Sequence, residues 1–430
     1  MALTGRAVLL ALAGVVAVVL VPGWTSLLGW LGVLVVAVVV DLALAASPRA
    51  LALEREPMAA VRQDEPTVAS VVVTNPGRRR LRAVVRDAWQ PSAGAQVARQ
   101  RLDVPAGERR RVSTPLVPTR RGDRLSPGLA VRSLGPLGVA ARQRSLDLPG
   151  RLRVLPPFRS RRHLPSRLAR LRELEGRSAV QVRGQGTEFD SLREYVVGDD
   201  VRSIDWRATA RRSAVVVRTW RPERDRHVQL VLDAGRSSAA RIGDEPRLDA
   251  AMDAALLLAA LASRAGDRVD LAVHDRRVRA RVEGSSRTDL LPRLVEVMAP
   301  VEPALVEPDW SGVAAQVLTR LSRRSLVVLL TSLDATSVNS GLLPALGQLS
   351  RKHLVLVASV DDPALTAMAR RRGDVTAVHD AAAAERARLD AATVSAWVGR
   401  LGVEVVRGDA DDLPPALADR YLALKAAGRL

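Results

Sequence analysis

The stretch Val228–Asp233 (VQLVLD) is a nearly continuous apolar run that ends in a carboxylate. A strand buried on both faces of a parallel sheet has this pattern. Arg247–Ala265 follows with apolar residues at helical spacing, and strand-like and helix-like segments then alternate to residue 430. This alternation predicts right-handed crossovers and a central parallel sheet with helices on both faces. We therefore expect an α/β domain of Rossmann type over residues 227–430.

The other elements expected in this domain continue the alternation. Strands are expected at Arg268–Val273, Val278–Val282 (the hairpin partner of the strand before it), Ser325–Leu330, Leu354–Val360 and Val403–Val406, and helices at Asp289–Met298, Ser311–Leu321, Ala381–Leu401 and Pro414–Ala427.

Immediately upstream, Gly184–Arg226 reads GQGTEFDSLREYVVGDDVRSIDWRATARRSAVVVRTWRPERDR. Aromatic residues are only 3% of the chain, yet two tryptophans, a tyrosine and a phenylalanine fall here, interleaved with many arginines and carboxylates. No histidine, G-x-S-x-G elbow or Walker-type loop accompanies them. Such a concentration indicates either an internal network or a surface for a partner.

Each acid in this block has an arginine within a few residues, and a carboxylate paired with arginine has a lowered pKa and is a poor general acid. We therefore expect an arginine–carboxylate network, with Trp206 and Trp220 packed beneath arginines, and no catalytic residue. A docking surface remains open, because exposed aromatic residues with arginine are typical of interface hot spots. A hydrolase that uses the carboxylates of residues 188–205 is the alternative. The residues expected to form the network or the partner surface are Glu188, Phe189, Arg193, Tyr195, Asp199, Asp200, Arg202, Asp205, Trp206, Arg211, Trp220, Glu223 and Arg224.

Residues 151–183 are strongly basic, and we interpret residues 156–226 as a connector joined to this block. Ser166–Gly176 predicts a short amphipathic helix, whose arginines either face solvent or meet anionic headgroups. Residues 49–155 carry short β-rich runs between Gly/Pro turns, at Val68–Thr74, Leu81–Trp89, Val112–Val117 and Leu129–Ser133. They predict a small β-sandwich without a catalytic grouping.

Two apolar segments precede the sandwich, Ala7–Val21 and Leu27–Ala46, with a Pro22-Gly23 turn between them. About 20 apolar residues span a bilayer core, so residues 1–48 predict a transmembrane helical hairpin that contacts lipid over residues 4–46. Trp24 and Trp30 are expected at the interfaces, and Asp41 is expected to reach water or to pair within the hairpin. Arginines flank the hairpin but not its turn, which places both termini and the later domains in the cytoplasm, at the inner (plasma) membrane. A cleaved signal peptide is the alternative.

The composition limits the other classes of function. The 430 residues include no cysteine, which excludes disulfides and thiolate metal sites. The net charge of +19 is carried almost wholly by arginine and could attract nucleic acid or an anionic membrane. The apolar hairpin favours the membrane, and we expect no nucleic acid partner.

The central block resembles the signature of the domain of unknown function 58 family. The matching elements are Gly184–Phe189 (G-x-G-x-E-F), Arg193–Asp200 (R-E-Y-x-x-G-D-D), Arg202–Arg211 (R-x-I-D-W-x-A-T-A-R) and Glu223–Arg226 (E-R-D-R). The resemblance implies a bacterial membrane protein with two spans, a β-rich region and a von Willebrand factor A-like domain, which works with a MoxR-type AAA+ ATPase. We accordingly expect a membrane-anchored, non-enzymatic protein-interaction or assembly module.

Von Willebrand A domains usually hold Mg²⁺ through a D-x-S-x-S loop and later Thr and Asp residues, since hard cations need oxygen ligands. Here Asp233 and Ser237 match, but Gly235 replaces the first serine, and Arg236 adds a positive charge. After the strand Ser325–Leu330 the chain has Thr331-Ser332 where the family usually has S-D. We interpret Asp233, Ser237 and Ser332 as a degenerate site, with no metal or other cofactor, and Asp233 and Ser237 as caps of the following turn. A metal-dependent ligand-binding A domain is the alternative.

Overall fold

A computed structural model describes the chain except for residues 182–187, 212–213, 222–225 and 335–340. It forms two compact units, Met1–Pro157 and Phe158–Leu430. The chain has a mixed α/β architecture with several separate sheets. The apolar hairpin and the β-sandwich lie in the same unit.

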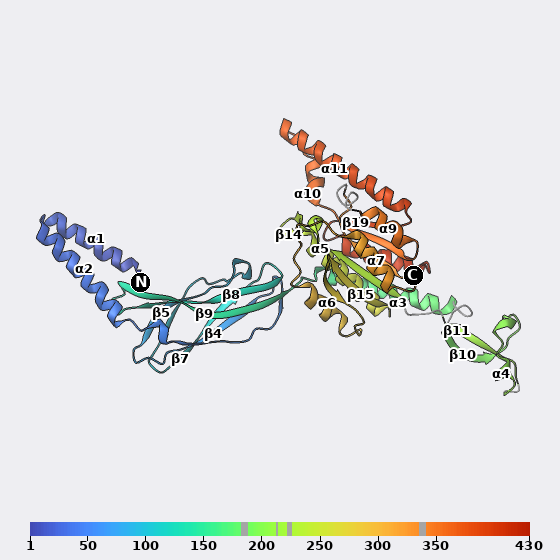
Figure 1. Cartoon of the computed structure of the whole chain (residues 1–430), viewed down its shortest axis with the longest axis horizontal. Helices are drawn as coiled ribbons and strands as arrows, with labels where there is room; N and C mark the ends of the chain where they lie inside the picture. The colour runs from blue at the N-terminus through green and yellow to red at the C-terminus, as the bar shows by residue number, and fades with distance from the viewer. Residues whose placement is uncertain (182–187, 212–213, 222–225, 335–340) are drawn as a thin grey trace. The chain divides into compact units, whose positions relative to one another are not determined.

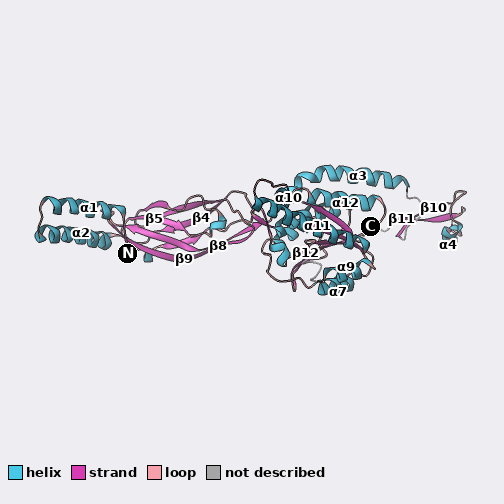
Figure 2. Ribbon diagram, turned by 90° about the horizontal axis from the view of Figure 1, so that it is seen from above, coloured by secondary structure: helices cyan, strands magenta, loops and turns pink. Residues whose placement is uncertain are grey.

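The first unit begins with two apolar helices, α1 (Gly5–Leu20) and α2 (Trp24–Leu44), which pack side by side (Figures 1 and 2). Trp30 forms this contact: its indole Nε1 donates to the carbonyl of Leu10 at 2.9 Å, and its ring covers Gly14 so closely that a Cβ there would lie 1.9 Å from it. The ring of Trp30 therefore fills the space between the two helices. The helical stretch Trp24–Ala50 is long and apolar enough to cross a membrane, whereas Gly5–Leu20 is shorter.

Two sheets form the rest of this unit, with strands that pair antiparallel except at Val61–Arg62, which lies parallel to Val154 and Leu155. One sheet has the strand order β1-β9-β8-β5-β6, with β3 beside β9, and the other has the order β2-β4-β7. The strands are β1 (Ala2–Leu3), β2 (Ala52–Arg55), β3 (Val61–Arg62), β4 (Thr67–Thr74), β5 (Leu81–Asp87), β6 (Gln100–Val104), β7 (Arg109–Leu116), β8 (Gly122–Leu134) and β9 (Ala140–Leu155). Strand β9 ends at Leu155, which is also the last residue of the expected β domain.

A buried polar network lies inside the sandwich. Arg55 donates to both carboxylate oxygens of Asp87 at 2.8 Å, and Ser126 Oγ and Trp89 Nε1 donate to the same carboxylate at 2.8 Å each. The guanidinium also lies 5.2 Å from the centre of the Trp89 ring. A buried charge pair is tolerated only when its remaining hydrogen-bonding groups are satisfied, and Asp87 meets that condition.

Asp41, near the end of α2, is completely buried and touches the turn between β8 and β9. Its carboxylate accepts hydrogen bonds from the backbone N–H groups of Leu137, Val139 and Ala140, at 2.7, 2.5 and 2.9 Å. A side chain at Gly135 would collide with it, at 2.3 Å from Oδ1. Asp41 thus neither reaches water nor pairs within the hairpin; it fastens the hairpin to the sandwich.

The second unit is built on a six-stranded sheet with the order β16-β15-β12-β17-β18-β19. All neighbours are parallel except the edge strand β16, which forms a hairpin with β15 as expected. The strands are β12 (His227–Asp233), β15 (Arg268–His274), β16 (Val278–Val282), β17 (Leu326–Leu330), β18 (Leu354–Val360) and β19 (Glu404–Gly408).

Helices cover both faces of this sheet. Helices α5 and α12 pack together on one face, and α7, α9 and α11 share a core with the strands on the other. The helices are α3 (Leu164–Gln181), α5 (Arg247–Arg264), α6 (Leu290–Met298), α7 (Trp310–Arg320), α9 (Leu342–Ser350), α10 (Pro363–Ala369), α11 (Val375–Arg400) and α12 (Leu413–Ala426). The short strands β13 (Arg241–Ile242) and β14 (Glu245–Pro246) form a small hairpin before α5.

Asp253, inside α5, holds the start of the second unit and gives it a pH dependence. Its carboxylate accepts from the backbone N–H of Ser160 at 3.0 Å and from the hydroxyl at 2.9 Å. Burial raises its pKa to about 6, with the Ser160 hydrogen bonds opposing the rise. A carboxyl with a raised pKa favours the folded state most when protonated, so its contribution to stability is lost as the pH rises from about 4 to about 6.

We therefore predict that Asp253→Asn removes this dependence, because asparagine stays uncharged. The free energy of unfolding of the wild type, minus that of the variant, should be about 2–3 kcal/mol larger at pH 4 than at pH 7.5. Thermal and denaturant unfolding in detergent would measure it, with the exposed Asp244→Asn as control. Parallel pH profiles of the wild type and Asp253→Asn would contradict the assignment.

Candidate functional site

The block singled out in the sequence forms a two-stranded arm. Strand β10 (Glu188–Glu194) pairs antiparallel with β11 (Val216–Arg221), and the segment between them carries the short helix α4 (Trp206–Thr209) (Figure 1). We call these two strands and the described residues between them the arm. Glu194 lies opposite Val216, and a backbone hydrogen bond from Tyr195 N to Val215 O continues the ladder. The arm therefore brings residues 195–215 together at its end.

A bidentate ion pair closes the first turn of this segment. Arg193 Nη1 and Nη2 donate to the two carboxylate oxygens of Asp199 at 2.8 and 2.6 Å. Asp199 also accepts from the backbone N–H of Val196 at 2.9 Å, and Gly198 takes the positive φ of 111° that the turn requires. Side chain and backbone together fix the turn to the end of β10.

A second ion pair fixes the helical part of the segment. Asp205 is the N-cap of α4 and accepts from the backbone N–H groups of Arg207 and Ala208 at 3.0 and 2.9 Å. Its other oxygen accepts from Arg218 Nε at 2.8 Å, on strand β11. The start of α4 is thereby tied to the second strand of the arm.

These contacts lower the pKa of both carboxyls. For Asp199 the largest cause is the hydrogen bond from Arg193, and for Asp205 it is the backbone hydrogen bond from Ala208, followed by Arg218. Two permanently ionised, hydrogen-bonded carboxylates suit a structural network better than proton transfer.

Apolar side chains lie exposed on the same segment. Trp206 is 69% exposed and Val197 95% exposed, and Val196 and Val201 are exposed beside them in the sequence. We call Val196, Val197, Val201 and Trp206 the apolar tip. The expectation that Trp206 packs beneath an arginine is wrong. Arg218 binds the carboxylate of Asp205, the residue before Trp206. No guanidinium of the described residues lies over the Trp206 ring.

The other predicted residues of the block have more modest roles. Asp200 accepts a hydrogen bond from the backbone N–H of Arg202 at 3.0 Å. The side chains of Arg202 and Arg211 are exposed and form no ion pair with the described part of the chain. Strand register places Glu188 opposite Arg221 and Phe189 opposite Trp220, whereas Glu223 and Arg224 lie outside the described residues.

The carboxyl end of the parallel sheet brings together a second group of predicted residues. Asp233, at the end of β12, is buried and accepts from Ser237 Oγ at 2.8 Å, Thr331 Oγ1 at 2.7 Å and the backbone N–H of Gly235 at 2.7 Å. Burial raises the pKa of Asp233, against the lowering effect of these hydrogen bonds. The Gly235 and Ser237 contacts make Asp233 the cap of the loop that follows it.

The hydroxyl of Ser332 donates to Asp334 at 3.0 Å, whereas Thr331, the first residue after β17, contacts Asp233. The residues do not fit a resident divalent cation. Only one carboxylate is present, its oxygens already accept three hydrogen bonds, and no cluster of three or more His, Asp or Glu occurs within the described residues. We derive no chemistry from a metal here.

Sequence reasoning missed three features of these sites. Arg218 as the partner of Asp205 depends on pairing across the arm, since the two residues are 13 apart in the chain. The apolar tip was not predicted, because valines such as Val196, Val197 and Val201 are common in buried strands and the sequence does not indicate that they are exposed. Thr331 was visible in the sequence, but its contact with Asp233 joins residues that are 98 apart in the chain.

Known proteins are similar to part of this chain. A family model described as "Protein of unknown function DUF58" matches residues 191–397, which include most of the arm and the sheet up to α11. The chain is 30% identical over 193 residues to "Uncharacterized protein Mb1516" of Mycobacterium bovis and to "Uncharacterized protein Rv1480" of Mycobacterium tuberculosis. That match covers 44% of this chain and 60% of the length of each relative.

Among solved structures, the chain is similar to the "ASH / PapD-like domain of human CEP192 (PapD-like domain 7)". The TM-score is 0.17 at 11% identity, covering 24% of this chain and 83% of that one.

We predict that Asp199→Ala loosens the end of the arm without unfolding either compact unit. The change removes the bidentate partner of Arg193 and the acceptor for Val196, so trypsin should cleave after Arg202 faster than in the wild type. The control is Asp200→Ala, an adjacent acid whose described contact is a single backbone hydrogen bond. Equal cleavage rates in the two variants would show that the Arg193–Asp199 pair does not hold the turn.

Proposed function

We propose that this chain is a member of the family whose model it matches, and that it is a membrane-anchored, non-enzymatic module that binds another protein. The observation that carries the proposal is the apolar tip, which stays exposed while two ion pairs hold the segment that bears it. Large apolar and aromatic side chains on a preorganised loop are typical of interface hot spots, since binding then costs little ordering.

The N-terminal helices support the membrane part of the proposal. Large apolar side chains are exposed along both helices, where a soluble protein would bury them. They are Val8, Leu9, Leu12, Val15, Val16, Val19, Leu27, Leu28, Leu31, Val33, Val35, Val36 and Val39. With α2 long enough to span and α1 packed against it, a bilayer would cover these faces. The flanking arginines favour cytoplasmic placement of both termini, of the β-sandwich and of the second unit.

The proposed partner is a MoxR-type AAA+ ATPase, by the family resemblance of the central block. Two features of the second unit are compatible with that assignment. The sheet order, with five parallel strands and one antiparallel edge strand, is the arrangement expected of a von Willebrand A-like domain. Exposed Arg202, Arg207 and Arg211 surround the apolar tip in the sequence and would favour an acidic patch on the partner.

Protein binding accounts for the arm better than the alternative functions. A hydrolase would need a carboxyl able to exchange protons, whereas Asp199 and Asp205 have lowered pKa values and are bound to arginine. A nucleic-acid surface usually offers several stacking platforms in a row, and the described part of the arm exposes one tryptophan.

We predict that Trp206→Ala weakens binding to the purified ATPase from the same organism. A hot-spot tryptophan contributes about 2 kcal/mol or more to binding, so the Kd should rise about 30-fold. Fluorescence anisotropy with the full chain in detergent would measure it. The control is Leu305→Ala, which removes an apolar side chain that is 80% exposed outside the arm. Unchanged binding by Trp206→Ala, or equal loss in both variants, would argue against the apolar tip as the docking surface.

We also predict that the full chain remains in the membrane pellet after alkaline carbonate extraction. Replacing Val35 and Val36, both exposed on α2, with arginine should release a large share of it, because each arginine at mid-span costs about 2.5–3.5 kcal/mol. Val68→Arg, an exposed apolar residue of the sandwich, is the control and should stay in the pellet. Complete extraction of the wild-type chain would exclude an integral anchor.

A further inference from the structure

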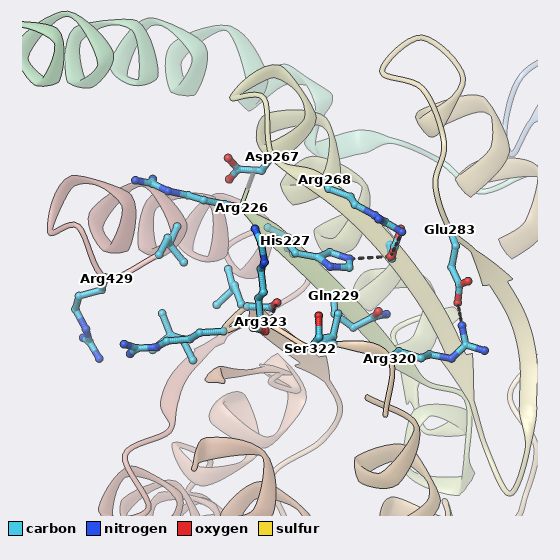
Figure 3. Close-up of a pocket in the computed structure, with 18 of the residues that line it drawn as sticks. Arg226, His227, Gln229, Asp267, Arg268, Glu283, Arg320, Ser322, Arg323 and Arg429 are labelled. Atoms are coloured by element: carbon cyan, nitrogen blue, oxygen red, sulfur yellow. Dashed lines mark hydrogen bonds and ion pairs between the residues drawn. The ribbon is translucent and has the colours of Figure 1, made fainter. Parts of the chain in front are cut away.

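A cavity of about 950 Å³ lies at the amino-terminal end of the parallel sheet. It is lined by the first residues of β12 and β15, by the segment before β17 and by the residues after α12 (Figure 3). Asp233 and Thr331 lie at the opposite, carboxyl end of the strands, so this cavity is separate from the degenerate site.

Arginine dominates its lining. Figure 3 shows Arg226 and Arg323 near His227, with Arg268 and Arg320 toward the side of Glu283. The six arginines of the lining are Arg226, Arg268, Arg320, Arg323, Arg324 and Arg429.

The acids of the lining are already engaged. Asp267 accepts from Lys425 Nζ at 2.9 Å and from the hydroxyl of Tyr421. Asp270 accepts from His227 Nε2 at 2.7 Å, and Glu283 pairs with Arg320. These carboxylates pair with two of the six arginines, Arg268 and Arg320, and a third, Arg429, pairs with Glu404 outside the lining.

Two of the arginines stand out. Within the described residues, neither Arg226 nor Arg324 has an ion pair. Guanidinium groups that share one cavity repel one another, and that repulsion would be relieved by an anion bound between them.

We propose that this cavity binds a soluble organic compound that carries two or more phosphate groups. The planar fork of a guanidinium matches two phosphate oxygens, and several forks around one space suit several phosphates. The volume is that of a site for one small molecule, and is too small for a nucleic acid duplex. Val228, Leu321, Leu326 and Leu354 supply apolar lining for the organic part, and no Phe, Tyr or Trp is among the described residues that line the cavity.

Isothermal titration of the full chain in uncharged detergent with inorganic pyrophosphate tests the proposal. We expect saturable one-to-one binding, with the affinity reduced about tenfold or more in each of Arg226→Gln and Arg324→Gln, because each removes a charge-assisted hydrogen-bond donor. The matched control is Arg202→Gln, which removes the same charge from an exposed arginine of the arm. Unchanged thermal unfolding would establish that the variants fold.

Absence of saturable binding would overturn the proposal. So would an equal loss of affinity in the control, which would indicate general attraction to the charge of +19. In a second experiment, phosphatidylglycerol vesicles are added to the complex of the full chain with pyrophosphate. Displacement by these vesicles, but not by phosphatidylcholine vesicles, would assign the cavity to lipid headgroups and contradict a soluble ligand. Binding that resists both kinds of vesicle and needs Arg226 and Arg324 would support it.

Discussion

The arginine–carboxylate pair is the interaction on which the irregular parts of this protein depend. Inside the sandwich, Arg55 and Asp87 join strands β2 and β5, and Ser126 and Trp89 complete the hydrogen bonds of the carboxylate. In the arm, Asp199 and Asp205 bind arginines from the two strands and fix the segment between them. Regular strands and helices satisfy their own backbone groups, whereas these turns need side chains to hold them. The chain has 65 basic residues and 46 acids, so not every arginine can form an ion pair with a carboxylate of its own. The cavity at the amino-terminal end of the sheet is one place where they gather.

Asp41 has the corresponding role between the hairpin and the sandwich. Three backbone N–H groups of the β8–β9 turn are satisfied by one buried carboxylate, and leaving them unpaired would cost about 1–3 kcal/mol each. The contact makes the first unit one body, in which an apolar helix continues directly into a β domain. If α2 spans a bilayer, this turn lies close to the membrane surface. Asp41, a charged residue within an apolar segment, is then the group that joins the apolar hairpin to the β-sandwich.

Much of the fold was predictable because its strongest signals are local. Leu354–Val360 and the β15–β16 hairpin were expected with nearly their observed bounds, since apolar runs and turn residues mark them in the sequence. Strand β9 was missed because its first half is exposed and rich in arginine, and it is a strand through its pairing with β8. Helix α9 was missed because Pro344 and Gly347 lie within it, and both residues disfavour a helix although they are not on its buried face.

The candidate sites were predictable only in part, for the same reason. The sequence identified the arm and most of its charged residues, but Arg218 meets Asp205 across two paired strands, and the exposure of Trp206 depends on where α4 begins. Thr331 rather than Ser332 contacts Asp233, and this contact joins residues that are 98 apart in the chain. The cationic cavity assembles residues from six separated parts of the chain, which no local pattern indicates.

Hydrogen–deuterium exchange of the full chain, with and without the purified MoxR-type ATPase, tests the central claim most directly. If the arm is the binding element, amides of residues 195–209 should exchange more slowly in the complex, while those around Asp233 and Thr331 should not change. Protection confined to the carboxyl end of the sheet, with the arm exchanging as in the free protein, would contradict the account.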